Sequence, residues 1–314
     1  MIADLTPTMV AAALVLVSVG AGATAPPAEG VLRVVSGTTG AGHATEQWLA
    51  ILRKRLSSER YDSVATLRKP WTEEEEAWAG LIRSRVTGWE RAIPDLGSLF
   101  PRTPPPVQVL IVLGNRGAED AFTHDAVTIG FDLSALQANY GSARLAENTE
   151  RIDRFFRHEF VHLFQKAWLT RHPWAMDTPL QGALAEIWGE GLGNYHSLSP
   201  RWLSREGKRS ETASRALAIL EPRFVARVGA LACATPEEAR ALTADLSNGP
   251  FDRKWGALPA ALWLEAEPGE PTESLRRFVL AGPEGVWDLA DRHLPDGLAA
   301  ALKEAHAADS LCRS

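Results

Sequence analysis

The chain has 314 residues, of which 45% are hydrophobic and 23% are charged. This is the composition of an ordinary globular protein, and 11 tryptophans and 10 phenylalanines supply enough apolar surface to exclude disorder as the main state. The 39 acidic and 33 basic residues give a net charge of −6, which argues against unspecific nucleic-acid binding because that needs a basic surface. We therefore expect no nucleic-acid partner.

The first 25 residues have the features of a signal peptide. An apolar run, Met9 to Val19, is too short to span a bilayer comfortably, and the small residues Ala21 to Ala25 follow it. No Lys or Arg precedes the run, so an uncleaved N-terminal anchor stays open as an alternative. The interpretation we favour is a signal peptide over residues 1–25, with cleavage after Ala23 or Ala25. It predicts a periplasmic or secreted protein with no integral membrane span after cleavage.

Residues 26–145 are predicted to form an N-terminal α/β part. The expected strands are Val31–Val35, Val107–Leu113 and Val127–Leu133, and the expected helices are Thr45–Leu56 and Trp71 to about Ala92. The glycine-rich segment Gly37–Gly42 has the spacing of a phosphate-binding loop. His43 and Ala44 stand where that loop needs Lys and Ser or Thr, so we interpret it as a strand-to-helix turn.

Residues 146–314 are predicted to be mostly helical, which makes the whole chain α+β. The expected helices are Asn148–Trp168, two that open at Thr178-Pro179 and Thr235-Pro236, Gly256–Glu265 and Ser274–Leu280. Two cysteines exclude a disulfide framework. Cys233 and Cys312 either form one bridge to the C-terminal tail or remain free thiols.

The sequence His158-Glu159-Phe160-Val161-His162 has the spacing of a metal-binding motif with an adjacent carboxylate. Residues four apart lie on one face of a helix, so both imidazoles can reach the same metal ion. Zinc lowers the pKa of a bound water, and Glu159 is close enough in sequence to take its proton. The surrounding residues are strongly apolar, and a metal would compensate the cost of burying two histidines among them.

A catalytic zinc needs a third protein ligand and an open fourth position. Glu190, in the next helical segment, is the preferred candidate, and Glu186, one turn earlier on the same face, is its rival. Glycines at 189, 191 and 193 would allow a close approach of two helices over a metal. Asn194, four residues after Glu190, is expected to accept the outer N–H of a metal-bound histidine.

These two segments, H-E-F-V-H and E-G-L-G-N-Y, resemble those of the gluzincins, the thermolysin-like zinc metallopeptidases. The resemblance covers about residues 105–200, and it departs from the family pattern at Gly193, where Ala is usual, and at Asn194, where an acidic residue is common. It implies a zincin-like fold with a mixed N-terminal sheet and an active-site helix between the two parts. It also implies one catalytic Zn²⁺ on His158, His162 and Glu190, with Glu159 as general base.

The resemblance further implies a peptide or protein substrate, bound along an edge strand before the active-site helix. Val127–Phe131 is the candidate, with an interior core strand as the alternative. A second electrophile for the oxyanion is left open among Tyr140, His172, Lys254 and His293. The expected function is an exported zinc-dependent metallopeptidase. The alternative is a catalytically inactive zincin-fold binding module.

Overall fold

The structure is a computed structural model that describes residues 30–312, with side chains as far as residue 307. All elements given below lie within Val31–Ser314, which form one compact unit. The predicted signal peptide lies outside the described residues. Among residues 30–312, no helix is both long enough and apolar enough to cross a membrane.

The N-terminal part contains a mixed sheet, as predicted. Its strands are β1 (Leu32–Ser36), β2 (Val109–Gly114), β3 (Ala121–Thr123) and β4 (Thr128–Asp132). The order across the sheet is β1-β2-β4-β3, with β1, β2 and β4 parallel and β3 antiparallel to β4. The fold class is therefore α+β.

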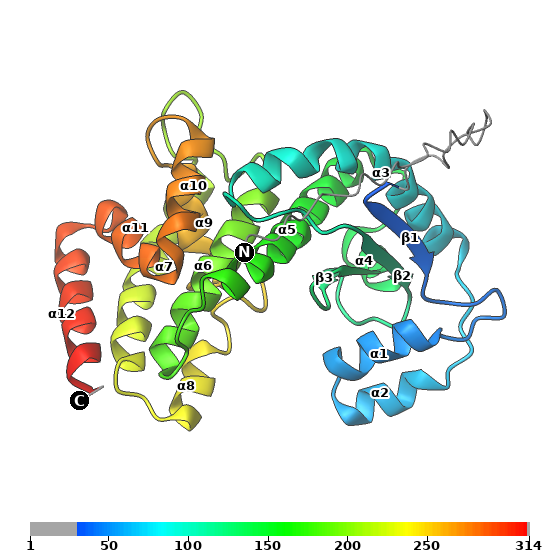
Figure 1. Cartoon of the computed structure of the whole chain (residues 1–314), viewed down its shortest axis with the longest axis horizontal. Helices are drawn as coiled ribbons and strands as arrows, with labels where there is room; N and C mark the ends of the chain where they lie inside the picture. Colours follow the sequence, from blue (N-terminus) through cyan, green and yellow to red (C-terminus); the bar gives the residue numbers. More distant parts are fainter. Residues whose placement is uncertain (1–29, 313–314) are drawn as a thin grey trace, which may run out of the picture. The chain divides into compact units, whose positions relative to one another are not determined.

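Helices cover both faces of this sheet (Figure 1). One face carries α1 (Glu46–Arg55) and α2 (Ser58–Ala65), and the other carries α3 (Glu73–Ser98), α4 (Leu133–Tyr140) and α5 (Ala146–Arg171). Alternate strand residues point to opposite faces, which decides what each side buries. Phe122 stacks on Trp48 of α1, whereas Phe131 stacks on Trp89 of α3, which in turn stacks on Phe156 of α5. The stacked aromatic rings fix α5 against the sheet.

The Gly37–Gly42 segment is a turn between β1 and α1, as interpreted from its missing lysine. It returns the chain from β1 to the N-cap of α1, where the Thr45 side chain accepts from the backbone N–H of Trp48. Gly42 has a φ of +85°, which a glycine adopts without strain. The segment thus has a local structural reason for its glycines.

The rest of the chain is helical. Its elements are α6 (Pro179–Ser197), α7 (Glu211–Leu231), α8 (Pro236–Thr243), η1 (Phe251–Arg253), α9 (Ala257–Glu265), α10 (Pro271–Ala281), η2 (Gly282–Glu284), α11 (Gly285–His293) and α12 (Asp296–Cys312). The predicted starts at Thr178 and Thr235 are confirmed, and both form capping boxes. The predicted boundary near residue 145 coincides with the start of α5, although the buried core continues across it.

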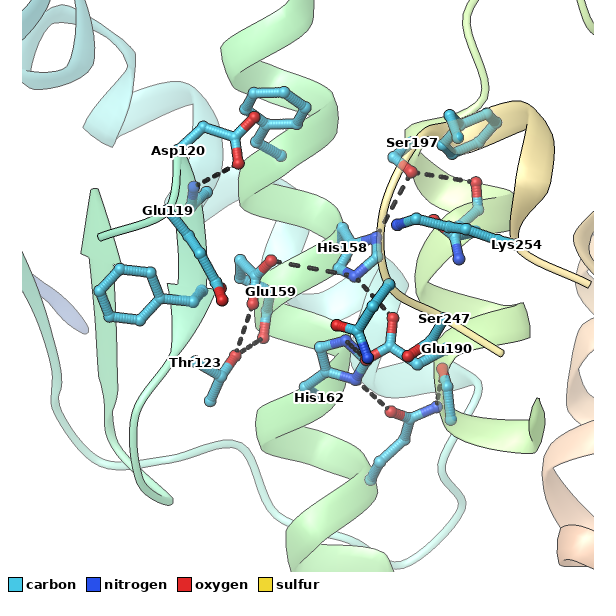
Figure 2. A pocket seen from close by; sticks show the side chains of 18 of the residues that line it. Glu119, Asp120, Thr123, His158, Glu159, His162, Glu190, Ser197, Ser247 and Lys254 are labelled. Atoms are coloured by element: carbon cyan, nitrogen blue, oxygen red, sulfur yellow. Dashed lines mark hydrogen bonds and ion pairs between the residues drawn. The ribbon is translucent and has the colours of Figure 1, made fainter. Parts of the chain in front are cut away.

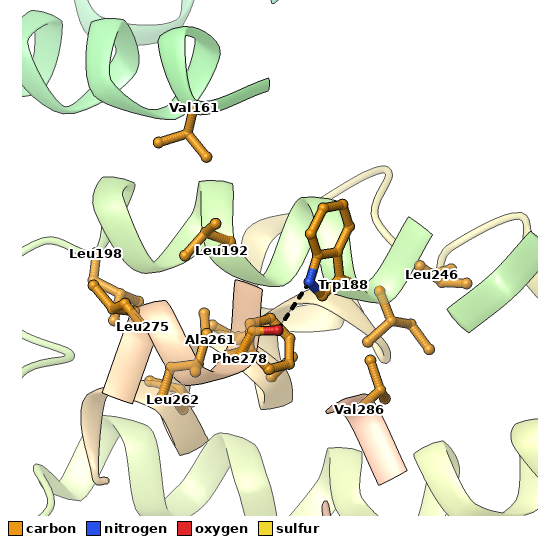
Figure 3. Packing of buried hydrophobic residues seen from close by; sticks show 14 of the residues in the cluster. Val161, Trp188, Leu192, Leu198, Leu246, Ala261, Leu262, Leu275, Phe278 and Val286 are labelled. Atoms are coloured by element: carbon orange, nitrogen blue, oxygen red, sulfur yellow. Dashed lines mark hydrogen bonds between the residues drawn. The ribbon is translucent and has the colours of Figure 1, made fainter. Parts of the chain in front are cut away.

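Helix α6 is held between α5 and the later helices (Figure 3). Trp188 of α6 is 1% exposed, and its indole N–H donates to the carbonyl oxygen of Phe278 in α10 at 3.2 Å. Every residue of α9 from Ala257 to Leu264 is buried, so the neighbouring helices pack around this apolar helix. Gly191 makes the contact close, because a Cβ there would lie 2.7 Å from the Cβ of Ala260.

Cys233 follows α7 and is disulfide-bonded. The predicted bridge names Cys312 as the other half, and the side chain of Cys312 lies outside the described residues.

Replacing Gly191 by Ala tests the α6–α9 contact. The added methyl would have to push α9 away, and overpacking of this kind costs about 1–3 kcal/mol. We expect urea denaturation of Gly191→Ala to give a lower free energy of unfolding by that amount. The matched control is Gly182→Ala on the same helix, where a Cβ meets nothing within 4 Å. The control should match or exceed the stability of the unmodified protein, and equal losses in both variants would contradict the packing argument.

Candidate metal centre

Three metal-ligating side chains meet between α5 and α6 (Figure 2). His158 and His162 stand one turn apart on α5, and Glu190 reaches them from α6. The Nε2 atoms of His158 and His162 lie 3.6 and 3.5 Å from the carboxylate oxygens of Glu190. One ligand atom from each residue can be chosen so that all three lie within 4.8 Å of one another. The fold thus brings together the three residues that the sequence analysis selected.

The geometry of this cluster fits a tetrahedral metal ion. Ligand atoms bound to one zinc at about 2.1 Å are about 3.4 Å from one another. The two histidine-to-glutamate distances, 3.6 and 3.5 Å, are close to that separation. Two imidazoles and one carboxylate are also a donor set of catalytic zinc sites, which keep the fourth position open.

Helix α6 passes close to α5 because of its glycines. A Cβ on Gly193 would lie 2.9 Å from Nε2 of His158, so a larger residue would press on the ligand ring. At Gly189 a Cβ would meet the Gln165 side chain at 3.7 Å, which is an ordinary contact. The predicted role of glycine in close approach therefore applies to Gly193 at the ligands and to Gly191 at α9.

The outer nitrogens of both histidines have partners. Nδ1 of His162 lies 2.7 Å from Oε1 of Gln165, and the amide of Gln165 donates to the Gly189 carbonyl at 3.0 Å. Nδ1 of His158 lies 3.4 Å from the hydroxyl of Ser197. Such partners fix the ring orientation and leave Nε2 to the metal. Gln165 also joins the two ligand-bearing helices, because Gly189 directly precedes Glu190.

The prediction for Asn194 is wrong in its detail. Ser197 and Gln165 hold the positions that we expected Asn194 to fill. Asn194 is 1% exposed and lines the same cavity, and its side-chain nitrogen has no hydrogen-bond partner among the described residues. The reason is helical geometry: Ser197 is seven residues after Glu190, two turns along the same face, and reaches the outer side of His158.

Glu159 projects beside the ligand cluster and is held by the sheet. Its carboxylate lies 3.8 Å from Nε2 of His158, and the side chain is 9% exposed. The hydroxyl of Thr123 in β3 lies 2.9 Å from Oε2 of Glu159 and 2.9 Å from the backbone oxygen of the same residue. These contacts hold the carboxylate on the β3 side of the ligand cluster.

The electrostatics of the cluster favour a cation. Burial by itself would raise the pKa of Glu190, but the charges of His162 and His158 outweigh it and hold the pKa at about 2. For His158, burial lowers the pKa, and the carboxylates of Glu159 and Glu190 more than reverse this effect. Glu190 is therefore a carboxylate at neutral pH, ready to bind a positive ion.

Glu186, the rival third ligand, is turned away from the cluster. Its carboxylate accepts a hydrogen bond from the Ser247 hydroxyl at 2.5 Å and is not part of the ligand group. Burial raises its pKa, Ser247 opposes that change, and Glu190 adds to it. The arrangement favours Glu190 over Glu186.

The predicted edge strand needs a correction. Val127–Phe131 overlaps β4, which is interior because β2 and β3 pair with its two sides, so the alternative interpretation is confirmed. The edge strand beside β4 is β3, a segment of three residues that sequence patterning did not single out. It packs against α5 and lines the cavity beside the ligand cluster.

Part of the free edge of β3 is already hydrogen-bonded. In the antiparallel ladder, Phe122 and the residues two positions before and after it make the backbone hydrogen bonds to β4. The backbone N–H and C=O groups of Ala121 and Thr123 therefore point away from β4. The Arg55 guanidinium donates to the Thr123 carbonyl at 2.9 Å, and the Ala121 N–H donates to the Asp120 side chain at 3.2 Å. Within the described part of the chain, the Ala121 carbonyl and the Thr123 N–H remain for an added strand.

A cavity of about 920 Å³ opens over the ligand cluster. Its walls come from β3, α4, α5, α6 and the segment 247–254. Tyr140 and Lys254, two of the candidate electrophiles, line it, whereas His172 and His293 do not. His172 stacks on Trp168, and His293 pairs with Glu267 at 2.8 Å. Of the four candidates for the second electrophile, Tyr140 and Lys254 are therefore the two that lie at the cavity.

Three supporting residues were missed by sequence reasoning. Gln165 could have been found, because a polar residue three positions after His162 falls on the ligand face of the helix. Thr123 and Ser197 gave no local signal, since their roles depend on where β3 and the end of α6 lie in space.

Comparison with known proteins adds no relationship: no family model, no curated protein and no solved structure matches the chain.

The rival ligands can be compared directly. We expect Glu190→Gln to weaken Zn²⁺ binding by more than about 100-fold, since loss of a supporting residue typically costs about 10–100-fold and a ligand costs more. Glu186→Gln should bind zinc as the unmodified protein does. Competition with a chromophoric chelator measures both affinities. A larger loss in Glu186→Gln would reverse the assignment.

Gln165 contacts His162 on α5 and Gly189 on α6, and this gives a second prediction for metal affinity. Gln165→Leu removes the partner of His162 and the bond to Gly189, and we expect zinc affinity to fall about 10–100-fold. Ser197→Ala should have a smaller effect, because its contact to His158 is long at 3.4 Å. The same chelator competition tests the order, and equal affinities in Gln165→Leu and the unmodified protein would exclude the supporting role.

Proposed function

We propose that the protein is an exported, zinc-dependent metallopeptidase that hydrolyses peptide bonds with Glu159 as general base. The observation that carries the proposal is the convergence of His158, His162 and Glu190 from two helices, with the Glu159 carboxylate beside them. The resemblance of the two motifs to those of gluzincins supports it.

His158, His162 and Glu190 would hold the zinc ion. When bound, zinc supplies a Lewis acid that polarises the substrate carbonyl and lowers the pKa of a water molecule in the open position. The hydrogen bond that His162 donates to the Gln165 side-chain oxygen and the contact of Ser197 with His158 preorganise the two rings for this task.

Glu159 would move the protons. Its carboxylate takes a proton from the attacking water and later gives it to the nitrogen of the departing amine. The Thr123 hydroxyl, 2.9 Å from the carboxylate, keeps it directed at the reacting water rather than at bulk solvent. The C–N bond breaks, and the products are a carboxylate and a free amine.

A peptide substrate is supported by the free edge of β3. The Ala121 carbonyl can accept from a substrate N–H, and the Thr123 N–H can donate to a substrate carbonyl. Both residues line the cavity, as does Glu159. Arg55 already occupies the Thr123 carbonyl, so the strand offers a short stretch of pairing rather than a long ladder.

Export rests on the predicted signal peptide over residues 1–25. The disulfide of Cys233 supports it, because such bonds persist in oxidising compartments such as the bacterial periplasm. A periplasmic or secreted location follows from the same argument.

The variant Glu159→Gln tests the mechanism. The amide keeps the size of the side chain but cannot take a proton, so we expect kcat on a quenched fluorescent peptide library to fall about 10²–10⁴-fold. Zinc, measured by elemental mass spectrometry, should stay at about one ion per chain.

His158→Ala is the companion variant, and it should lose both the metal and the activity. Unchanged turnover in Glu159→Gln would remove Glu159 from the mechanism. Zinc bound without any hydrolysis of peptides by the unmodified protein would favour the alternative, an inactive zincin-fold binding module.

A further inference from the structure

A lysine faces the ligand cluster from the side opposite the sheet. Lys254 follows η1 and precedes α9, and it lines the cavity together with His158 and Glu190. Figure 2 shows its side chain extending toward His158, with the cluster between it and Thr123 of β3. A substrate strand on β3 would therefore place its scissile bond between Glu159 and Lys254.

The ammonium of Lys254 is uncommitted, unlike the other cationic groups of the cavity. Arg55 pairs with Glu119 at 2.9 Å, and Lys166 donates to the Asp125 carbonyl at 3.1 Å. Within the described residues, the Lys254 ammonium makes neither an ion pair nor a hydrogen bond, and it lies 5.6 Å from the centre of the Phe251 ring. A half-buried cation without a partner in a cavity is suited to an anion that the protein itself does not provide.

Packing and a hydrogen bond hold the backbone around Lys254 in place. Trp255 is fully buried, and its N–H donates to the Asp245 carbonyl at 3.2 Å. A Cβ on Gly256 would lie 2.7 Å from Ile187 of α6, so the segment packs directly on the helix that carries Glu190. The position of the lysine is therefore tied to that of the metal ligands. Burial raises the pKa of Glu190, and the charge of Lys254, after those of the two histidines, helps to lower it.

We propose that Lys254 is a catalytic residue that donates a hydrogen bond to the carbonyl oxygen of the scissile peptide bond as it becomes an oxyanion. This inference rests on the proposed function. The water oxygen forms a bond to the carbonyl carbon, the C–N bond then breaks, and Glu159 carries the proton to the amine. Lys254 keeps its own proton throughout and lowers the barrier by electrostatic stabilisation.

Tyr140, the other candidate that lines the cavity, is less suited to this task. Its hydroxyl donates to the Asp120 carboxylate, and the Arg151 guanidinium lies 4.4 Å from the centre of its ring. Burial and the Asp120 charge raise the pKa of Tyr140, so its proton is held by Asp120 and is not offered to a substrate.

The test compares Lys254→Met and Lys254→Arg with Arg253→Met. Met keeps the length of the lysine stem without its charge, Arg restores the charge, and Arg253 is an exposed neighbour that controls for a general loss of positive charge. The measurements are kcat and KM on the best quenched fluorescent peptide, zinc per chain, and the affinity of a phosphinic peptide of the same sequence, which imitates the tetrahedral intermediate.

In Lys254→Met we expect kcat to fall about 10²–10³-fold, with KM changed by less than about threefold and zinc unchanged. Affinity for the phosphinic peptide should fall in parallel with kcat/KM, because both report binding of the transition state. Lys254→Arg should recover part of the loss, and Arg253→Met should behave as the unmodified protein.

Three outcomes would overturn the assignment while the proposed function stands. The first is an active protein in which Lys254→Met keeps kcat within about threefold. The second is a change in KM alone, which would mean that Lys254 binds a substrate carboxylate. The third is loss of zinc in Lys254→Met, which would make it part of the metal site. A zinc-loaded unmodified protein that neither hydrolyses peptides nor binds the phosphinic peptide would end the proposed function itself, and the role of Lys254 with it.

Discussion

The close crossing of α5 and α6 is the constraint on which the site depends. His158 and His162 can only share an ion with Glu190 if two helix axes come near enough for short side chains to meet. The absence of a Cβ at Gly193 makes room for the His158 ring, and the absence of one at Gly191 lets α9 press on the other side of α6. The apolar packing of α9 therefore holds Glu190 against the histidines.

The sheet and the later helices contribute one wall each to the cavity. Thr123 of β3 holds the Glu159 carboxylate, and the segment before α9 brings Lys254 from the opposite direction. The candidate metal ligands lie on α5 and α6, between the two walls. In the proposed function, an extended peptide would lie between a strand edge that can pair with its backbone and a cation that faces its carbonyl.

Local signals predicted the parts of the fold that local chemistry decides. The capping boxes at Thr178 and Thr235 and the spacing of His158 and His162 needed only neighbouring residues to be recognised. Two long helices differ from the prediction: α3 continues past Pro94 beyond its predicted end near Ala92, and α7, which carries Pro222, was not predicted. In both helices, buried apolar residues follow the proline, and their packing outweighs the lost hydrogen bond.

What sequence could not supply is the pairing of side chains from distant segments. The glycines beside Glu190 indicated a close approach of two helices, which the structure has. That Ser197 rather than Asn194 contacts His158 depends on where the end of α6 lies against His158. The edge position of β3 has the same origin, since strand order is a property of the whole sheet.

The Thr123 hydroxyl has one hydrogen and two acceptors in reach, the carboxylate and the main-chain oxygen of Glu159, both at 2.9 Å. When the carboxylate is ionised, the hydrogen can point at it. Once Glu159 carries a proton, the acid can donate to the threonine oxygen while the hydroxyl turns to the main chain. A single bond rotation would then satisfy both protonation states of Glu159, so the carboxylate could gain and lose a proton without displacing β3.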